Sequence, residues 1–474
     1  MEETTNTGEI ITEQAPEGKN EESQGNITVI DSVMGSGKTS YIIQYMNENP
    51  ERAFVYCTPF LDEIERIRGR KNKEGEWELF PSCPHLHFAE PTFFKGRKID
   101  DFNKLLFERR NIAVTHATFA NATEETIQNI KEGEYILILD ETLNTLVDFN
   151  EICTGQKLRK GDISLLLANG YISVDPETSV VTWLDKECKE TRYEDVERMA
   201  KNGSLLLINH TLLYWEFPHT IFKLFKEVYI LTYLFEGSVM SSYLKSHDIT
   251  WTKKSVCVDS VDEWGNKHFS LTDYTQSLDR IAEFRDLVTI FQNDKMNAYT
   301  GSSLSKTWFM KYAKSEDIAQ LQKNLTNFFR NRMKADPKDI LWTTIKDYKD
   351  KLKGKGYTRT RRMTEQERMK PQAEREKIES RLSCFLPCNS RATNQYSERS
   401  VLAYVLNVYP SPHVTDYLSK RNSPLDRNKY ALCQMIQWIW RSRIRNGEPI
   451  VIYIPSCRMR KFFNEWLQGG VTGD

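Results

Sequence analysis

A glycine-rich segment that ends in lysine and threonine is the part of the sequence best suited to chemistry. Its residues are Met34, Gly35, Ser36, Gly37, Lys38, Thr39 and Ser40, which follow a β-branched run at 27–31. Glycines let the backbone curl until its N–H groups point at phosphate oxygens, and a helix beginning there adds its positive end. Lys38 would then reach the β- and γ-phosphates, and the Thr39 hydroxyl would coordinate Mg²⁺. The segment predicts a site for ATP, although Ser32 stands where the usual pattern begins with glycine.

Two adjacent carboxylates form the second chemical signal. Asp140 and Glu141 follow the apolar run 135–139, which is typical of a buried strand. Ligands of open α/β sheets bind at the carboxyl ends of the strands, so both side chains would meet the glycine-rich loop. We expect Asp140 to hold Mg²⁺ and Glu141 to orient the attacking water, since phosphoryl transfer depends on positioning and charge neutralisation.

Polar side chains recur every four residues near the carboxyl end of the chain. Gln437, Arg441 and Arg445 would share one face of a helix expected over 425–445. On spacing alone they are either solvated surface residues or groups aimed at a ligand.

The elements that must position these residues form an α/β pattern. Strands are expected at 27–31, 53–57, 111–115, 135–139 and 228–232, with helices between them, which favours a parallel sheet covered on both faces. A second α/β region has expected strands at 306–310, 339–345, 401–408 and 449–454, and a helix at 315–332.

The domain organisation follows from this pattern. Residues 1–24, rich in glutamate, are expected to be a disordered acidic tail. A first domain spans 25–245, with an inserted subdomain at about 145–225 that holds a helix near 162–167 and a hairpin over 171–183. A second domain spans 246–474 and carries a basic loop at about 351–381.

Composition limits the possible classes of protein. The 474 residues carry 65 Lys+Arg against 66 Asp+Glu, so nucleic acid would have to bind local patches rather than a global positive field. The apolar runs are too short for a membrane span and no secretory leader is visible, so we expect no membrane partner and a cytoplasmic location. The nine cysteines are scattered and predict reduced thiols rather than a zinc site.

Taken in order, these motifs resemble those of superfamily 2 helicases and translocases, specifically the divergent DEAD/DEAH-like proteins of phages and prophages. Motif I is similar to 34–39, motif Ia to 58–59, the next nucleic-acid motif to 115–118, and motif II to 140–142. Motif III resembles 231–233, motif V lies near 391–394, and motif VI resembles 437–445. Only motifs I and II are specific by themselves.

The resemblance implies two RecA-like P-loop NTPase domains in tandem that hold ATP between them. It implies that Arg441 and Arg445 act as arginine fingers, that Gln437 senses the γ-phosphate, and that Thr232 couples hydrolysis to domain motion. Nucleic acid would contact Thr58, Thr115 and Thr393. Single-stranded or forked DNA is expected in preference to RNA, although the sequence does not decide between them, and the activity would serve phage replication with a possible replication-protein partner.

Three departures from the family pattern bear on these roles. Trp440 stands where the family has glycine and the second arginine is displaced by one position, so the choice of finger among Arg441, Arg443 and Arg445 stays open. No glutamine motif for adenine precedes the loop, and the insert is longer than is usual.

Two other functions fit the same motifs. A phage packaging ATPase shares the loop and the Asp-Glu strand, but it also needs a nuclease site with clustered acidic ligands. An ATP-binding switch or scaffold would bind ATP tightly, turn it over slowly, and ignore polynucleotides.

Overall fold

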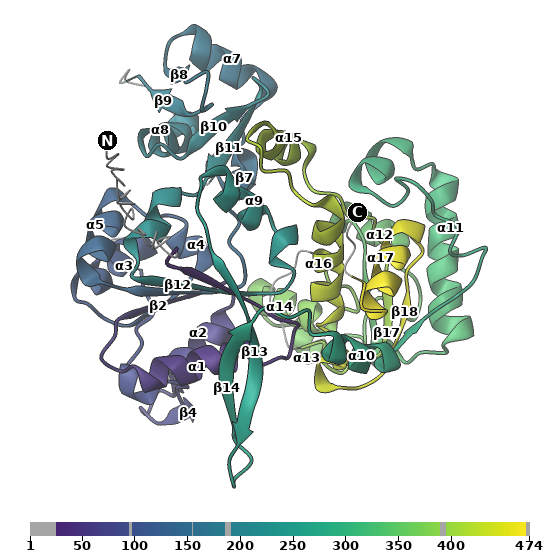
Figure 1. Ribbon diagram of the computed structural model, residues 1–474. Coiled ribbons are helices and arrows are strands. Elements are labelled where there is room, and N and C mark those ends of the chain that lie inside the picture. Colours follow the sequence, from purple (N-terminus) through teal and green to yellow (C-terminus); the bar gives the residue numbers. More distant parts are fainter. Residues whose placement is uncertain (1–24, 94–96, 154, 185–190, 389–394, 471–474) are drawn as a thin grey trace, which may run out of the picture.

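The computed structural model describes residues 25–93, 97–153, 155–184, 191–388 and 395–470. Two α/β lobes lie side by side, a first lobe (25–273) and a second lobe (278–470), and a smaller insert (146–216) sits on the first lobe (Figure 1). The expected acidic tail at 1–24 lies outside the described residues.

The first lobe is built on a seven-stranded sheet with the order β14-β13-β1-β12-β6-β2-β5. All neighbouring strands are parallel except the hairpin pair β13 and β14. The strands are β1 (Ile27–Asp31), β2 (Phe54–Thr58), β5 (Ile112–Thr115), β6 (Ile136–Asp140), β12 (Glu227–Thr232), β13 (Thr252–Val261) and β14 (Lys267–Asp273). The five strands predicted for this half are confirmed.

Side chains alternate between the two faces of this sheet, and helices cover both. Ile30, Tyr56 and Ile138 pack with α1 (Lys38–Glu48) and α2 (Leu61–Arg68). Their sequence neighbours pack on the opposite face with α3 (Lys98–Phe107), α5 (Glu124–Gly133), α9 (Val239–Ser246) and the insert. The short helix α4 (His116–Phe119) follows β5, and a small hairpin, β3 (Arg70–Lys71) and β4 (Trp77–Leu79), follows α2.

The sheet continues past residue 245, the end that the sequence predicts for the first domain. β13 pairs in parallel with β1, and β14 then turns back along β13. A hairpin formed after residue 245 therefore completes the first sheet by binding the free backbone of β1, and the sheet ends at Asp273.

The insert combines a three-stranded sheet with helices. Its sheet has the order β10-β11-β7, and a separate pair joins β8 to β9. The elements are β7 (Leu146–Asp148), α6 (Phe149–Ile152), α7 (Lys160–Ala168), β8 (Ile172–Val174), β9 (Val181–Trp183), α8 (Glu194–Lys201), β10 (Leu205–Ile208) and β11 (Leu212–Glu216). The predicted helix and hairpin correspond to α7 and to β8–β9.

The second lobe contains a four-stranded parallel sheet in the order β15-β18-β17-β16. Its strands are β15 (Val288–Ile290), β16 (Ile340–Thr343), β17 (Val401–Tyr404) and β18 (Ile450–Tyr453). Three of the four predicted strands are confirmed, but the strand at 306–310 is wrong. That segment enters the helical turn η5 (Trp308–Tyr312), because Phe309 packs into the core under α11, and β15 takes the edge of the sheet instead.

The helices of the second lobe correct two further predictions. They are α10 (Leu278–Leu287), α11 (Ser315–Thr326), α12 (Lys349–Leu352), α13 (Glu365–Arg368), α14 (Gln372–Leu382), α15 (Pro412–Lys420), α16 (Arg427–Ile439) and α17 (Cys457–Leu467). The predicted loop at 351–381 contains α13 and most of α14. The helix predicted over 425–445 ends at Ile439, because Ser442 is extended (φ −83°, ψ −177°) and a separate 3₁₀ turn, η9 (Arg443–Asn446), follows.

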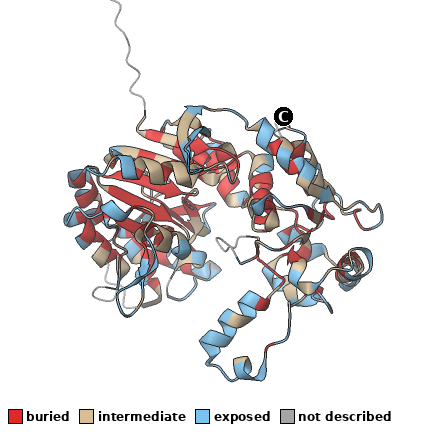
Figure 2. Cartoon of the chain, turned by 90° about the horizontal axis from the view of Figure 1, so that it is seen from below, coloured by how far each residue is buried: buried red, intermediate tan, exposed pale blue. Residues whose placement is uncertain are grey.

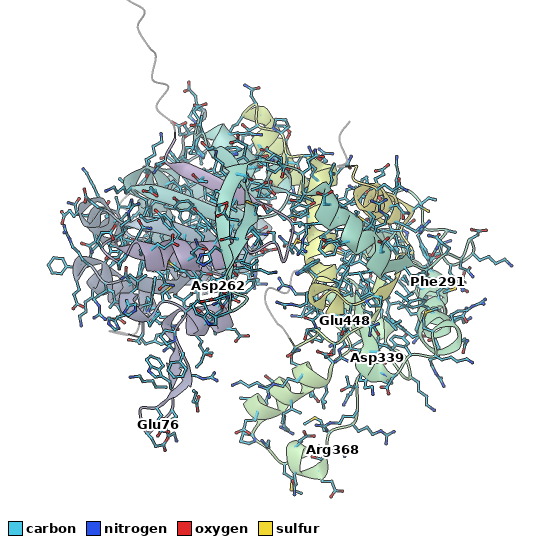
Figure 3. The ribbon with its side chains drawn as sticks, turned by 60° about the horizontal axis from the view of Figure 1, so that its bottom comes forward. Glu76, Asp262, Phe291, Asp339, Arg368 and Glu448 are labelled. Carbon is cyan, nitrogen blue, oxygen red and sulfur yellow. The ribbon has the colours of Figure 1, made fainter. Side chains whose placement is uncertain are left out.

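Burial is concentrated in the two sheets, whereas α13 and α14 form a largely exposed arm (Figure 2). The ends of this arm near Arg368 and of the β3–β4 hairpin near Glu76 project on the same side of the molecule (Figure 3). None of the eight cysteines within the described residues forms a disulfide. Across the same residues, no helix has the length and apolar character that crossing a bilayer requires.

Candidate nucleotide-binding site

Three adjacent strands bring the predicted site residues to one edge of the first sheet. β12 lies between β1 and β6, with Asp31 opposite Thr232 and Leu231 opposite Asp140. Because the three strands are parallel, the loop after β1, the end of β12 and the carboxylates after β6 converge. The structure therefore brings together the two specific motifs that the sequence predicts.

The glycine-rich loop needs glycine at two positions. Gly35 and Gly37 have φ values of 76° and 102°, in the left-handed region that favours glycine. A Cβ at Gly37 would lie 2.2 Å from the ring of Phe269, and one at Gly35 would lie 3.0 Å from Trp440. Gly37 is also the N-cap of α1, so the loop leads directly into the positive end of a helix.

Lys38 folds back over its own loop. Its Nζ donates to the carbonyl oxygens of Ser32 at 2.5 Å and Val33 at 3.1 Å. Burial lowers the pKa of Lys38, while the nearby carboxylates, Glu141 first, act in the opposite direction. A triphosphate would offer this amine anionic acceptors in place of two neutral carbonyls, and an opposite charge nearby favours the ionised amine.

Asp140 is a buried residue at the end of β6. The hydroxyl of Tyr56 on β2 donates to its Oδ2 at 3.0 Å. Burial, followed by the charge of Glu141, raises the pKa of Asp140 to about 7. A divalent cation would stabilise the carboxylate in such a place, because an opposite charge favours the ionised form.

The residues present fit Mg²⁺. Asp140 and Thr39 supply oxygen donors, which Mg²⁺ prefers, and within the described chain no group of three His, Cys, Asp or Glu side chains forms an all-protein cage. Mg²⁺ is usually held by one or two carboxylates together with substrate phosphates and water, which matches this sparse donor set.

Glu141 turns the chain sharply after Asp140. Its φ of 76° is uncommon for a residue with a side chain, and its N–H donates to the carbonyl of Leu231 at 3.0 Å. Backbone in this region costs of order 1–3 kcal/mol and tends to occur at functional sites. Its carboxylate accepts from Nε2 of Gln437 at 3.2 Å, a hydrogen bond that joins the two lobes.

Of the three candidate arginines, Arg441 is directed to the first lobe. It follows α16, which lies on the side of the second lobe that faces the first sheet (Figure 1). Its guanidinium carbon lies 5.6 Å from the ring centre of Phe60, beyond the end of β2. Burial lowers the pKa of Arg441, and the charge of Glu141 opposes that shift. Its Nε is buried and has no hydrogen-bond partner among the described residues.

The shared helical face predicted for Gln437, Arg441 and Arg445 is wrong beyond residue 439, because α16 ends there. Arg445 lies in η9, and its positive charge contributes to lowering the pKa of Arg441. Arg443 is turned into its own lobe, where its Nε donates to the carbonyl of Pro449 at 2.6 Å.

Two contacts at the glycine-rich loop and the helix after it were not predicted from the sequence. Gln44 of α1 forms two hydrogen bonds to the backbone of Phe269 on β14, with its Oε1 accepting at 2.9 Å and its Nε2 donating at 3.3 Å. Arg280 of α10 donates to the carbonyl of Gly35 at 3.1 Å, beside Trp440. Phe269 and Arg280 are over 200 residues from the loop in the sequence, and a local sequence pattern gives no sign of such pairings.

The predicted nucleic-acid and coupling residues have local roles in this structure. Thr58 is fully buried, and its hydroxyl accepts from the N–H of Phe60 at 3.3 Å. Thr115 caps α4 by accepting from the N–H of Thr118 at 3.2 Å. Thr232 is buried at the end of β12, where its carbonyl accepts from the N–H of Ser32. Thr393 lies outside the described residues. The binding of nucleic acid by Thr58, Thr115 and Thr393, and the coupling role of Thr232, stay predictions.

Comparisons with known proteins cover most of the chain. Residues 282–467 match the family model described as the YonV C-terminal Rossmann-like domain, and residues 154–215 match the YonV middle domain. The SPbeta prophage-derived uncharacterized protein YonV of Bacillus subtilis (strain 168) is 34% identical over 458 residues, which are 93% of this chain and 98% of that protein. The second lobe is therefore Rossmann-like. The residues that match the C-terminal domain, 282–467, include all four strands of its parallel sheet, β15 to β18.

Proposed function

We propose that this chain, which belongs to the family of the prophage protein YonV, is an ATP-dependent nucleic-acid helicase or translocase of the superfamily 2 type, and the proposal rests on the chain's own site residues. One observation carries the proposal: Gln437 of the second lobe donates to Glu141 of the first, 3.2 Å away, beside the loop that would hold the triphosphate. Side chains of both lobes therefore meet where the γ-phosphate would lie.

In this proposal the first lobe supplies the hydrolytic groups. The loop from Met34 to Ser40 cradles the phosphates, with Lys38 on the β- and γ-phosphates. Mg²⁺ supplies charge neutralisation at the phosphates when bound, and Thr39 and Asp140 hold it. Glu141 orients the attacking water from the strained turn after β6.

The second lobe would complete the site. Arg441 is the proposed arginine finger, because its buried Nε lacks a partner and the charge of Glu141 acts on its guanidinium. Gln437 would exchange its bond to Glu141 for one to the γ-phosphate. Hydrolysis would then remove the phosphate that Gln437 contacts and so weaken one contact between the lobes, which is how two RecA-like domains would convert turnover into movement.

The substrate proposed is DNA rather than RNA. Because YonV is prophage-derived, we assign the activity to phage replication in the cytoplasm of the host, with a replication protein as a possible partner. Thr58 and Thr115 end adjacent strands, β2 and β5, at the edge that carries the site. Phosphates of a bound strand would lie along this edge once the lobes close.

The direct test is the ATPase rate measured with single-stranded, duplex and forked DNA and RNA. We expect Mg²⁺-dependent hydrolysis that rises with DNA and declines steeply as salt increases. Hydrolysis that no polynucleotide changes would refute the motor proposal, and metal-dependent cleavage of the DNA would favour the packaging alternative.

A nucleotide switch is the second candidate, and the loop contacts favour it. Arg280 and Trp440 of the second lobe already contact Gly35, so nucleotide binding could change how the lobes pack without any turnover. Tight ATP binding with negligible hydrolysis, and no response to polynucleotides, is the outcome that selects the switch.

A further inference from the structure

A buried tyrosine on β2 contacts the carboxylate that would bind the metal. Tyr56 is fully buried, and its hydroxyl lies 3.0 Å from Oδ2 of Asp140. The sequence gives no sign of this role, because Tyr56 lies in the apolar run 53–57 and looks like an ordinary core residue of a strand.

The sheet register explains how the two side chains meet. Tyr56 is directly opposite Ile138, so Asp140 lies two residues further along the same face of the neighbouring strand. Diagonal neighbours of this kind are about 7–8 Å apart, within reach of a long aromatic side chain. A shorter residue at position 56 would leave the carboxylate without this contact.

The hydroxyl is held as a donor. The phenol O–H points at Oδ2 of Asp140, and an ionised carboxylate can only accept a hydrogen bond, so Tyr56 donates. The ring is fixed in the core between the sheet and helices α1 and α2. A rigid donor on Oδ2 fixes the rotation of the carboxylate and leaves Oδ1 for another ligand.

We propose that Tyr56 is a positioning residue that holds Asp140 in the orientation needed to bind the Mg²⁺ of a metal–nucleotide complex. The inference rests on the proposed function, because it assumes that this site takes Mg·ATP. Groups that orient metal-binding carboxylates typically contribute 10–100-fold to metal affinity or activity.

The same sheet contains a matched control. Tyr229 on β12 donates to Oε2 of Glu227 at 2.9 Å, a tyrosine–carboxylate bond at the start of a parallel strand and thus at the opposite edge from the site. Tyr229→Phe removes the same chemical group from the same sheet without touching Asp140.

The test measures metal-dependent nucleotide binding, which is independent of turnover. A fluorescent ATP analogue is titrated onto wild type, Tyr56→Phe and Tyr229→Phe, first in EDTA and then across a Mg²⁺ series. We expect Tyr56→Phe to raise the Mg²⁺ concentration for half-maximal effect about tenfold and to leave binding in EDTA unchanged. Tyr229→Phe should match wild type in both conditions.

A double variant separates positioning from a general packing effect. In an Asp140→Asn background, Tyr56→Phe should cause no further change in Mg²⁺ dependence, because the carboxylate it orients is gone. An unchanged Mg²⁺ dependence in Tyr56→Phe, or an equal loss in both backgrounds, overturns the inference. If wild type binds no nucleotide under any condition, the proposed nucleotide site itself fails, which is a distinct result.

Discussion

Two carboxylates of the first lobe and its insert accept hydrogen bonds from the second lobe, at two separate places. Glu141 accepts from Gln437 at 3.2 Å beside the glycine-rich loop, and Glu216 of β11 accepts from the hydroxyl of Tyr417 on α15 at 3.2 Å. Glu216 is buried and also contacts Nε2 of His247 at 3.2 Å. Both bonds join the same two halves of the chain over the same distance, yet their surroundings differ.

The difference lies in the residues that surround each carboxylate. Around Glu216, a hydrogen bond between the hydroxyls of Tyr214 and Ser411 and one from Arg421 to the carbonyl of Thr178 complete the contact between the insert and α15. Around Glu141, buried Oγ of Ser36 and Nε of Arg441 have no partner among the described residues. Other buried polar atoms, such as Oγ1 of Thr145, also lack a partner among the described residues, but Ser36 is part of a loop whose glycines suit phosphate and Arg441 is a cation near Glu141. We infer that the contact at Glu216 is a structural joint and the one at Glu141 is a ligand site.

The largest expected effect comes from exchanging each carboxylate for its amide. Glu141→Gln should lower the ATP hydrolysis rate by about 10²–10⁴-fold, because the amide cannot accept a proton from the attacking water. ATP binding, measured by equilibrium titration, should be kept. Glu216→Gln is the matched control and should hydrolyse ATP at the wild-type rate; equal losses in the two variants would contradict the distinction between joint and ligand site.

The next effect concerns the arginines after α16. Arg441→Ala should reduce turnover by about 10²–10³-fold, the usual loss when one donor to developing charge is removed. Arg443→Ala should leave the turnover of folded protein near wild type, because its guanidinium bonds to the carbonyl of Pro449 in its own lobe. Single-turnover hydrolysis assays of both variants check the assignment, and a larger loss in Arg443→Ala would reverse it.

The joint should respond in stability rather than in rate. Glu216→Gln places an amide where two donors, Tyr417 and His247, converge on a carboxylate. We expect a loss of about 1–3 kcal/mol in the free energy of unfolding, because a buried donor is left poorly matched. Denaturant unfolding followed by circular dichroism measures this loss, and Glu141→Gln should show a smaller one.

The smallest expected effect is a pH dependence confined to the joint. His219 stacks on His247 with ring centres 4.0 Å apart, and burial, followed by the charge of His247, lowers the pKa of His219. Glu216 partly opposes this shift, whereas Lys223 and Arg421 add to it. The unfolded chain therefore binds this proton more readily than the folded protein, so stability should fall as the pH drops below about 6.5. His219→Gln should weaken this decline in thermal melts at pH 7.5 and 5.5, and an unchanged decline would place the acid sensitivity elsewhere.

Local patterns were sufficient for the parts of the site that are close in sequence. Strand, loop and helix from Ile27 to Glu48 are specified by β-branched residues, glycines and apolar spacing, and the run before Asp140 is specified in the same way. Parallel pairing then brings these segments together, because ligand sites form at the carboxyl edge of such sheets.

Tertiary contacts determined what the sequence did not reveal. Helical spacing suggested one face for Arg441 and Arg445, but an extended Ser442 ends that helix register. Tyr56 and Phe269 have residue types that any buried strand would carry, and only the register and the long-range pairing give them neighbours in the site.

The contact between Phe269 and Gly37 has a consequence for how this protein can change. The ring lies where any side chain at position 37 would have to go, and the φ of 102° at this position favours glycine even if the ring were smaller. Position 37 should therefore stay glycine whatever residue stands at position 269. A graft of the phosphate-binding segment into another scaffold would need to carry the β13–β14 hairpin with it.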